Sequence, residues 1–245
     1  MLAGCDLVFQ VDVPDLCRDA GPFIAPVPLE GLPQARLFDP TLRADGRQLF
    51  FSQFDDLFVV TRNSTAEPFG APQPTSLSTV GRDFDPSLTV DGLRLFYLVD
   101  NTMFESVREK TADAFGLGLA RADVQDFLHS FDVSHDGLTI YYDTENDGFY
   151  MTRRPTLISA FGAPIAIGSE RRWPSISHDE LELFYEDEPT EQVFRVTRES
   201  RDAPFEGTGD VILQGADPEI SDSGELLTFG PPNHEGFAVA ERPCN

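Results

Sequence analysis

Aspartate recurs in the sequence inside a short step that usually combines an aromatic residue, the acid and a proline. The step occurs at Phe38-Asp39-Pro40, Phe84-Asp85-Pro86, Phe131-Asp132-Val133 and Ala216-Asp217-Pro218. Four carboxylates placed around one centre could bind a hard cation or polarise a sugar. However, a residue that recurs in nearly every repeat is usually structural, and aspartate at a strand entry accepts hydrogen bonds from backbone amides. We therefore expect these aspartates to hold the fold together.

One repeat departs from this pattern, because Trp173 replaces the aspartate and follows Glu170-Arg171-Arg172. Arginine binds anions through charge and paired hydrogen bonds, and an aromatic ring stacks on a ligand or a cation. The corresponding loops of other repeats contribute three further polar residues. The predicted ligand-binding set is Arg82, Asp83, His129, Arg171, Arg172 and Trp173. The alternative interpretation of Arg171 to Trp173 is a packing substitution that leaves the arginines exposed.

We predict no catalytic residue, since the sequence contains no Ser-His-Asp order, no glycine-rich phosphate loop and no cofactor motif. The alternative is a glycan-active hydrolase, which needs two carboxylates on opposite sides of a glycosidic bond. Its candidate residues are Asp39 or Asp85 combined with Glu170 or Glu186. Because Asp-Pro recurs as part of the repeat, it carries little information about catalysis.

A possible calcium loop begins at Asp143-x-Glu145-x-Asp147-Gly148. An EF-hand would end in an acid that this sequence lacks, since Arg154 occupies that position. We therefore expect a solvated hairpin loop and no metal or other cofactor, with weak calcium binding by Asp143, Glu145 and Asp147 as the alternative. The histidines at 129, 135, 178 and 234 show no ligand spacing. His135 and His178 precede turns, and we expect them to be exposed.

The elements that must position these residues are set by an internal repeat. Phe23, Phe69, Phe115, Phe161 and Phe205 are spaced 46, 46, 46 and 44 residues apart, and each follows proline or alanine. The aspartate step, or its Arg172-Trp173-Pro174 variant, follows each of these phenylalanines in turn. Two markers that stay in step five times indicate five copies of one structural unit.

Each copy contains the pattern of four short strands. An alternating run after the aspartate step leads to a tight turn such as Asp45-Gly46 or Asp91-Gly92, where glycine favours a two-residue hairpin. A second strand, a third strand ending near Thr-Arg, and a weaker fourth strand follow. Four antiparallel strands per roughly 45 residues are typical of a propeller blade.

The ends of the chain indicate how the ring closes. The fifth copy lacks its fourth strand, and residues 22–30 form a fourth strand without a blade. We predict an all-β, five-bladed β-propeller in which this N-terminal strand completes the last blade. The predicted boundaries are a tether at 1–21 and a propeller at 22–245, with blades at about 35–80, 81–123, 127–168, 170–214 and 215–242.

The segment from Phe84 to Tyr97 resembles the WD-like β-propeller repeat of TolB-like proteins, and the resemblance extends over about residues 22–242. It implies a binding module of the cell envelope or a secreted one. TolB itself has six blades and an extra domain, so its partners are not carried over. By analogy with propellers in general, we expect a ligand at the face formed by the loops that enter strand one and join strands two and three.

Composition restricts the partners. The 42 acidic residues outnumber the 18 basic ones, giving a formal net charge of −24, and all the bases except Lys110 are arginine. Such a surface repels phosphate backbones, so nucleic acid is excluded as a partner. No apolar run reaches the roughly 18–20 residues of a membrane helix. We expect a monomer that binds a protein or a glycan and contacts a membrane only through a lipid anchor.

The cysteines suggest where the protein resides. Leu2-Ala3-Gly4-Cys5 resembles the lipobox of bacterial lipoproteins, in which the cysteine is lipidated. Lipidation of Cys5 leaves Cys17 and Cys244, which flank the predicted closing seam and could pair in an oxidising compartment. We expect a periplasmic or surface lipoprotein of the bacterial envelope, with a secreted protein as the alternative. Two unpaired thiols in the chain ends remain the other interpretation of Cys17 and Cys244.

Overall fold

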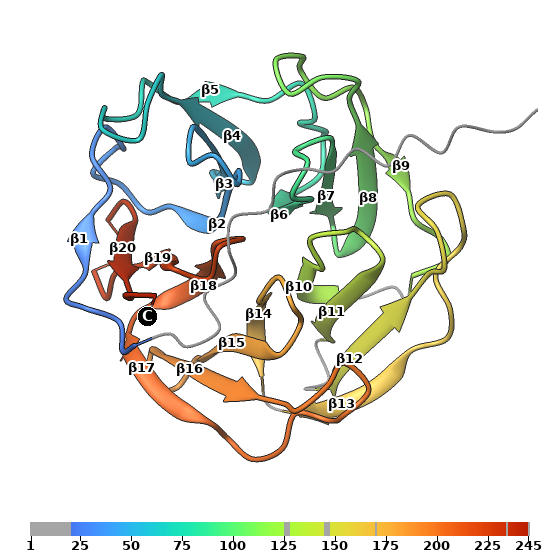
Figure 1. The fold of residues 1–245 in the computed structure, drawn as a ribbon. Helices are drawn as coiled ribbons and strands as arrows, with labels where there is room; N and C mark the ends of the chain where they lie inside the picture. The colour runs from blue at the N-terminus through green and yellow to red at the C-terminus, as the bar shows by residue number, and fades with distance from the viewer. Residues whose placement is uncertain (1–20, 125–127, 145–147, 170, 234, 245) are drawn as a thin grey trace, which may run out of the picture.

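The computed structural model describes residues 21–124, 128–144, 148–169, 171–233 and 235–244. These residues form five four-stranded antiparallel sheets arranged in a ring around a central axis (Figure 1). The chain is therefore a five-bladed β-propeller, which confirms the predicted fold class. The described residues contain no helix that is long and apolar enough to cross a membrane.

The strands follow the repeat. The first blade contains β2 (Phe38–Leu42), β3 (Gln48–Gln53), β4 (Asp56–Thr61) and β5 (Gln73–Pro74). The second contains β6 (Asp83–Leu88), β7 (Arg94–Val99), β8 (Thr102–Val107) and β9 (Leu119–Ala120). The third contains β10 (Leu128–Val133), β11 (Thr139–Thr144), β12 (Gly148–Arg153) and β13 (Ile165–Ser169). The fourth contains β14 (Arg172–Ile176), β15 (Glu182–Asp187), β16 (Gln192–Thr197) and β17 (Asp210–Gln214).

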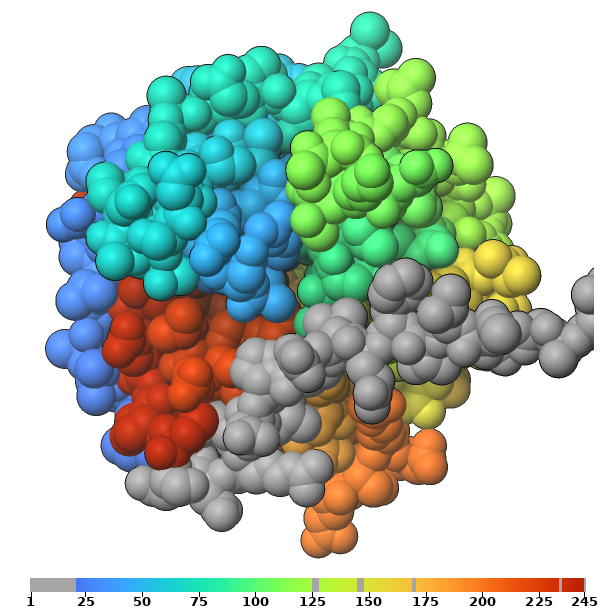
Figure 2. Space-filling model, turned by 45° about the horizontal axis from the view of Figure 1, so that its top comes forward, coloured from blue at the N-terminus to red at the C-terminus, as the bar shows by residue number. Residues whose placement is uncertain are grey.

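The fifth blade joins the two ends of the chain. It contains β18 (Ala216–Ile220), β19 (Leu226–Gly230), β20 (Ala238–Glu241) and, from the N-terminal side, β1 (Val27–Pro28). The β1 strand pairs with β20, and the amide of Gly21 donates to the carbonyl of Pro243 at 3.0 Å. Figure 2 shows the blue N-terminal residues against the red C-terminal blade. The ring closes as predicted, because β1 from the N-terminal side supplies the fourth strand of the fifth blade and covers the edge of β20.

An arginine at the end of the third strand of each blade, buried in four of the five blades and half-buried at Arg62, explains why the phenylalanine marker recurs. The guanidinium at the end of each third strand lies over the marker ring, at 4.3 Å for Arg62 over Phe69 and 5.0 Å for Arg242 over Phe23. Its Nε donates to the carbonyl of the residue at the first turn of the same blade, as Arg62 does to Gly46 at 2.7 Å. The remaining pairs are Arg108 with Phe115, Arg154 with Phe161 and Arg198 with Phe205. A desolvated cation–π contact contributes up to about 2 kcal/mol. This contribution explains why the arginine and the phenylalanine recur together in all five blades.

Apolar side chains fill the spaces between neighbouring blades in five clusters. In one of them Phe51 of the first blade meets Phe237 of the fifth at 5.9 Å between ring centroids, edge to face. Both rings are nearly inaccessible to solvent. Because a fully buried phenylalanine contributes about 1.5–3 kcal/mol, this packing makes the ring a rigid frame for its loops.

Candidate functional site

A depression of about 630 Å³ lies at one mouth of the central channel. It is lined by the loops that enter the first strands and by the turns that join the second and third strands, which is the face expected from the sequence. Its lining includes Phe38, Phe54, Arg82, His129, Trp173, and a group of acids at Glu186, Glu188 and Glu191. The side chain of Phe54 is 81% exposed. The depression therefore combines aromatic surface with a mostly acidic rim.

Trp173 is held in this depression by the neighbouring third blade. Its backbone amide donates to the hydroxyl of Ser130 at 2.8 Å, and its indole meets the ring of His129 edge to face with centroids 4.9 Å apart. The buried carboxylate of Asp143 accepts from Ser130 Oγ and contacts Nδ1 of His129 at 3.1 Å. Trp173 is thus held by Ser130 and His129, and both of these residues are held by Asp143.

Arg172 extends the same network to the acidic rim. One of its terminal nitrogens lies 3.5 Å from Nε2 of His129 and 3.2 Å from a carboxylate oxygen of Glu188. With Asp143 bonded to Nδ1, the arginine faces the second ring nitrogen of His129. Arg172 therefore links His129 of the third blade to the exposed carboxylate of Glu188 at the rim of the depression.

Two of the predicted ligand-binding residues have other roles. Arg171 is buried and donates to the carbonyl of Gly207 at 2.6 Å, so it supports the fourth blade and does not line the depression. Asp83 lines the depression but is fully buried, and its carboxylate accepts from the amide and hydroxyl of Thr79 at 2.6 and 3.0 Å. Burial raises the pKa of Asp83. Arg82 remains open to solvent, with its guanidinium over the ring of Phe84 at 4.1 Å.

The recurring aspartates join each blade to the next, as expected from the sequence. Asp39 accepts from the amide of Asp85 at 3.1 Å, and Asp85 accepts from the amide of Phe131 at 2.6 Å. Asp217 accepts from the amide of Asp39 across the closing seam. Ser130 and Glu186 supply the acceptors for the other two junctions, at the amides of Trp173 and Asp217. At each of the five junctions around the channel, a backbone amide is thereby hydrogen-bonded to a side chain of the neighbouring blade.

Asp132 is a correction to the expected ring, because it is not equivalent to Asp39, Asp85 and Asp217. Its cross-strand partner is Tyr141, and the same register aligns it with Thr41, Ser87, Ser175 and Glu219 in the other blades. At this deeper level Asp132 accepts from the amide of Ile176 at 2.8 Å and from Ser87 Oγ at 2.7 Å. The space left between the two levels measures about 20 Å³, which is room for about one water molecule.

The carboxyls proposed for the hydrolase alternative are spread over two levels. Glu186 lines the depression, Asp85 lines the narrow channel below it, and Asp39 lines both. Burial raises the pKa of Asp39, and burial together with the charge of Asp39 raises the pKa of Asp85 well above its usual range. Burial and the nearby Glu188 and Glu191 raise the pKa of Glu186 to about 7. Glu170 lies outside the described residues, and each of the other three carboxyls holds a backbone amide.

The metal and cysteine predictions fall partly on residues that are not described. Glu145, Asp147, His234, Cys5 and Cys17 lie outside the described part of the chain. Asp143 is described, and both of its carboxylate oxygens are engaged by Ser130 and His129. The expectation that His135 and His178 are exposed is wrong: His135 is buried, and the Nδ1 atoms of the two rings lie 2.9 Å apart.

The residues that hold His129, Arg172 and Trp173 in place were not predicted from the sequence. Asp143 and Glu188 carry no recurring signal, and only the folded third and fourth blades bring them to His129 and Arg172. Ser130 stands seven residues before the turn residue Gly137, which is the repeat position of Asp39, Asp85 and Asp217. A signal was present for the deeper channel, because Ser87, Asp132, Ser175 and Glu219 all stand five residues before the turn residue at 92, 137, 180 or 224. Aligning the repeats on the turn would have found them.

Comparison with known proteins supports the fold alone. No family model and no curated protein matches the sequence. A solved structure of a protein described as a candidate TolB from Agrobacterium tumefaciens matches with a TM-score of 0.51 and 15% identity, covering 79% of this chain and 69% of that one. The β-propeller domain of Cps50 (Swd1) from Myceliophteria thermophila matches with a TM-score of 0.45 and 9% identity, covering 80% and 66%. The likeness to the TolB structure is one of fold, and it agrees with the β-propeller described above.

Proposed function

We propose that this protein is a non-catalytic binding module that recognises a protein segment at the depression over the channel mouth. The observation that carries the proposal is the joining of exposed aromatic surface and an acidic rim on a closed, rigid ring. Recognition sites are commonly built from loops fixed by such a frame. The carboxyls that join neighbouring blades support the choice of binding over catalysis, because each already holds a backbone amide.

The chemistry of the depression favours a segment that presents a lysine or arginine beside an apolar residue. Glu188, Glu191 and Asp55 supply negative charge at the rim, while Trp173 and Phe54 supply aromatic surface. A cation over an aromatic face gains about 0.5–2 kcal/mol. The site already holds guanidinium groups on Phe38 and Phe84, through Arg36 at 5.0 Å and Arg82 at 4.1 Å. Acidic charge also speeds encounter with a basic partner.

A peptide array of random ten-residue segments with graded lysine and arginine content tests this function, alongside an array of bacterial polysaccharide fragments. We expect retention of peptides that combine a basic with an apolar side chain. Trp173→Asp should weaken that binding about 30-fold, as expected for a central aromatic anchor. Glu188→Gln should weaken it less and reduce its salt dependence. Asp202→Asn is the control, since its side chain is 93% exposed outside the depression.

The other outcomes identify the competing functions. Retention of polysaccharides in place of peptides would replace the protein ligand with a glycan at the same depression. Turnover of an arabinan or fructan that Asp39→Ala abolishes while the fold survives would establish the hydrolase of the five-bladed type. The raised pKa of Glu186 is the feature such an acid catalyst would use. If neither array retained the protein, a structural spacer without a ligand would be the remaining function.

We further propose that the module has a WD-like repeat, belongs to the bacterial envelope through lipidation at Cys5, and carries a disulfide between Cys17 and Cys244. The hydrogen bond from Gly21 to Pro243 supports the disulfide, because Gly21 is four residues after Cys17 in the sequence and Pro243 directly precedes Cys244. Peptide mapping by mass spectrometry without reductant should recover these two cysteines joined. Recovery of both as alkylated free thiols would remove the disulfide from the proposal.

A further inference from the structure

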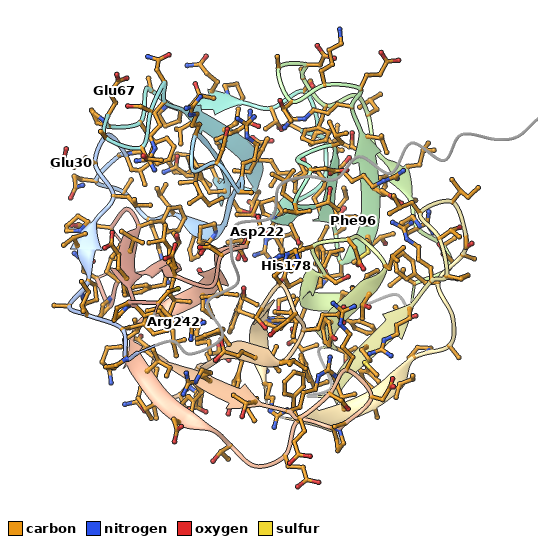
Figure 3. All side chains as sticks on the ribbon, in the orientation of Figure 1. Glu30, Glu67, Phe96, His178, Asp222 and Arg242 are labelled. Atoms are coloured by element: carbon orange, nitrogen blue, oxygen red, sulfur yellow. The ribbon has the colours of Figure 1, made fainter. Side chains whose placement is uncertain are left out.

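Three blades place a metal-ligand side chain at the same repeat position, at the end of the channel that carries the first turns. His135, His178 and Asp222 each precede by two residues the left-handed turn residue of their blade, which is Gly137, Glu180 or Gly224. Ala44 and Val90 occupy this position in the other two blades. Figure 3 shows His178 and Asp222 together near the centre of the ring. The depression described above lies at the other end, where the second strands run into the third.

The donor atoms of the three residues converge on one point. The two Nδ1 atoms lie 2.9 Å apart, Nδ1 of His178 lies 3.9 Å from Oδ1 of Asp222, and His135 Nδ1 contacts that same oxygen. Tetrahedral zinc with bonds of about 2.0–2.1 Å places its ligand atoms roughly 3.3 Å apart. The observed nitrogen–nitrogen and nitrogen–oxygen distances bracket that value, so small side-chain rotations would complete the geometry.

Backbone groups of the two neighbouring blades hold His135 in place, with its Nδ1 facing His178 and Asp222. The imidazole of His135 hydrogen-bonds to the backbone of Ile176, and the backbone carbonyl of His135 accepts from the amide of Val90 at 3.0 Å. Histidines that bind metals almost always donate their second ring N–H to a backbone carbonyl, a carboxylate or water, because this orients the ring toward the metal. His135 is therefore turned with Nδ1 toward the cluster by two neighbouring blades.

The cluster is also accessible. His135 and Asp222 are largely buried, whereas the His178 side chain keeps 22% of its surface exposed. An ion could enter past His178, and a solvent molecule could occupy the fourth ligand position. Two imidazoles and one carboxylate select transition metals over calcium and magnesium, which prefer oxygen ligands.

We propose that His135, His178 and Asp222 form a binding site for one zinc-type divalent transition-metal ion, which joins the third, fourth and fifth blades at the channel end opposite the depression. The site is independent of the proposed protein ligand, since no residue is shared between the two. Its coordination by three protein groups leaves one position open.

Equilibrium dialysis of the full chain against Zn²⁺ tests the site, after chelator treatment and alkylation of free thiols so that cysteines do not contribute. We expect one equivalent per chain, a melting temperature that rises with Zn²⁺ but not with Ca²⁺, and X-ray absorption showing two imidazole ligands. His178→Ala and Asp222→Ala should each weaken binding by more than the roughly 10- to 100-fold that loss of an outer partner costs. Asp202→Ala is the matched control and should bind as the wild type does.

His178→Ala keeps the test decisive if the more buried Asp222 variant fails to fold, because His178 is partly exposed. A circular dichroism spectrum like that of the wild type establishes that the variant retains its fold. Absence of saturable Zn²⁺ binding by the wild type would overturn the proposal. Equal binding by the wild type and a folded His178→Ala would overturn it as well.

Discussion

Trp173 occupies a backbone conformation that three other blades assign to aspartate. Its φ of 48° lies in the left-handed region, as do those of Asp39, Asp85 and Asp217. Aspartate tolerates this region better than a large aromatic residue does. The tryptophan therefore strains the backbone and lowers the free energy of unfolding relative to aspartate. Its presence at this cost in stability is consistent with a role in recognition.

The substitution Trp173→Asp separates these two effects. It restores the residue type of the other blades, so we expect the melting temperature to stay within a few degrees of the wild type or to rise. Peptide binding at the depression should weaken about 30-fold in the same variant. Thermal unfolding by circular dichroism measures the first effect, and a large drop in melting temperature would instead make Trp173 a packing residue.

Glu186 predicts how stability depends on pH. Its pKa is about 7 in the folded protein against 4.5 for the ordinary group, so the folded state holds a proton that the unfolded state releases. This stabilising contribution is complete below about pH 4.5 and is lost as the pH rises through 7. The raised pKa values of Asp39, Asp85 and Asp217 act in the same direction.

We therefore expect the wild type to be more stable at pH 5 than at pH 8 in urea titrations. Glu186→Gln, which keeps an acceptor for the Asp217 amide without a charge, should remove on the order of 2 kcal/mol of that difference. Glu206→Gln at an exposed position serves as the control. An unchanged pH dependence in Glu186→Gln would show that this carboxyl does not contribute.

The sequence allowed some site residues to be predicted and hid others for a geometric reason. Arg82, His129 and Trp173 were expected at the loop face, and they line the depression. Arg171 was expected there too, yet it is buried. The first strand of every blade contains a register shift, as between Arg172 and Ser175. Each shift changes which side chains face inward after it, so alternation counted along the sequence misplaces residues within these strands. Arg171 precedes its strand, and its burial depends on the contact with Gly207 far along the chain.

At the scale of the strands, the hydrogen bonds from backbone amides to the carboxylates of neighbouring blades allow a specific prediction about Asp85. Asp85→Ala leaves the buried amide of Phe131 without its acceptor, which should cost about 1–3 kcal/mol of unfolding free energy. Asp85→Asn keeps an acceptor and should cost less. Chemical denaturation of both variants measures the difference.

Asp55 provides a matched control for Asp85. It also has a left-handed backbone, with a φ of 64°, but its side chain is 74% exposed. Asp55→Ala therefore carries the same backbone penalty without the loss of a buried hydrogen bond. Equal destabilisation by the two alanine variants would mean that this hydrogen bond contributes nothing.

The strands themselves were predictable because each blade contains local signals. Asp-Gly turns such as Asp91-Gly92 define the first hairpin, and alternating apolar residues define its two strands. The fourth strands were less distinct, and β5 and β9 contain only two residues each. These outer strands pair along a single neighbour and are largely exposed, so their sequences lack the apolar pattern of the inner ones.

At the scale of the molecule, closure of the ring should contribute strongly to stability. Deleting residues 1–30 removes β1 and the Phe23 ring that lies under Arg242. We expect a fall in melting temperature of more than about 5 °C, since each kcal/mol shifts it by roughly 2–4 °C in a protein of this size.

Deletion of residues 1–20 alone is the control for this truncation, with both proteins measured under reducing conditions. The shorter deletion should change the melting temperature much less. If both deletions had the same small effect, the contribution of the closing strand would be negligible.

The net charge of −24 is also a property of the repeat. Many acids serve in turns or join neighbouring blades, such as Asp91, which accepts from the amide of Leu93 at 2.9 Å, and Asp85. The acidity therefore reflects how the blades are built as much as what they bind. The acids of the rim, such as Glu188, are the ones to which we assign a role in binding.

The hydrogen bond between Gly21 and Pro243 also means that the order of the blades along the gene is not dictated by the fold. A short peptide could join these two positions, and new termini could be opened in an exposed connection between other blades. Such a circular permutant would exchange the non-covalent seam of the fifth blade for a seam elsewhere. The propeller could then display fused domains from any of its five sides while keeping the depression intact.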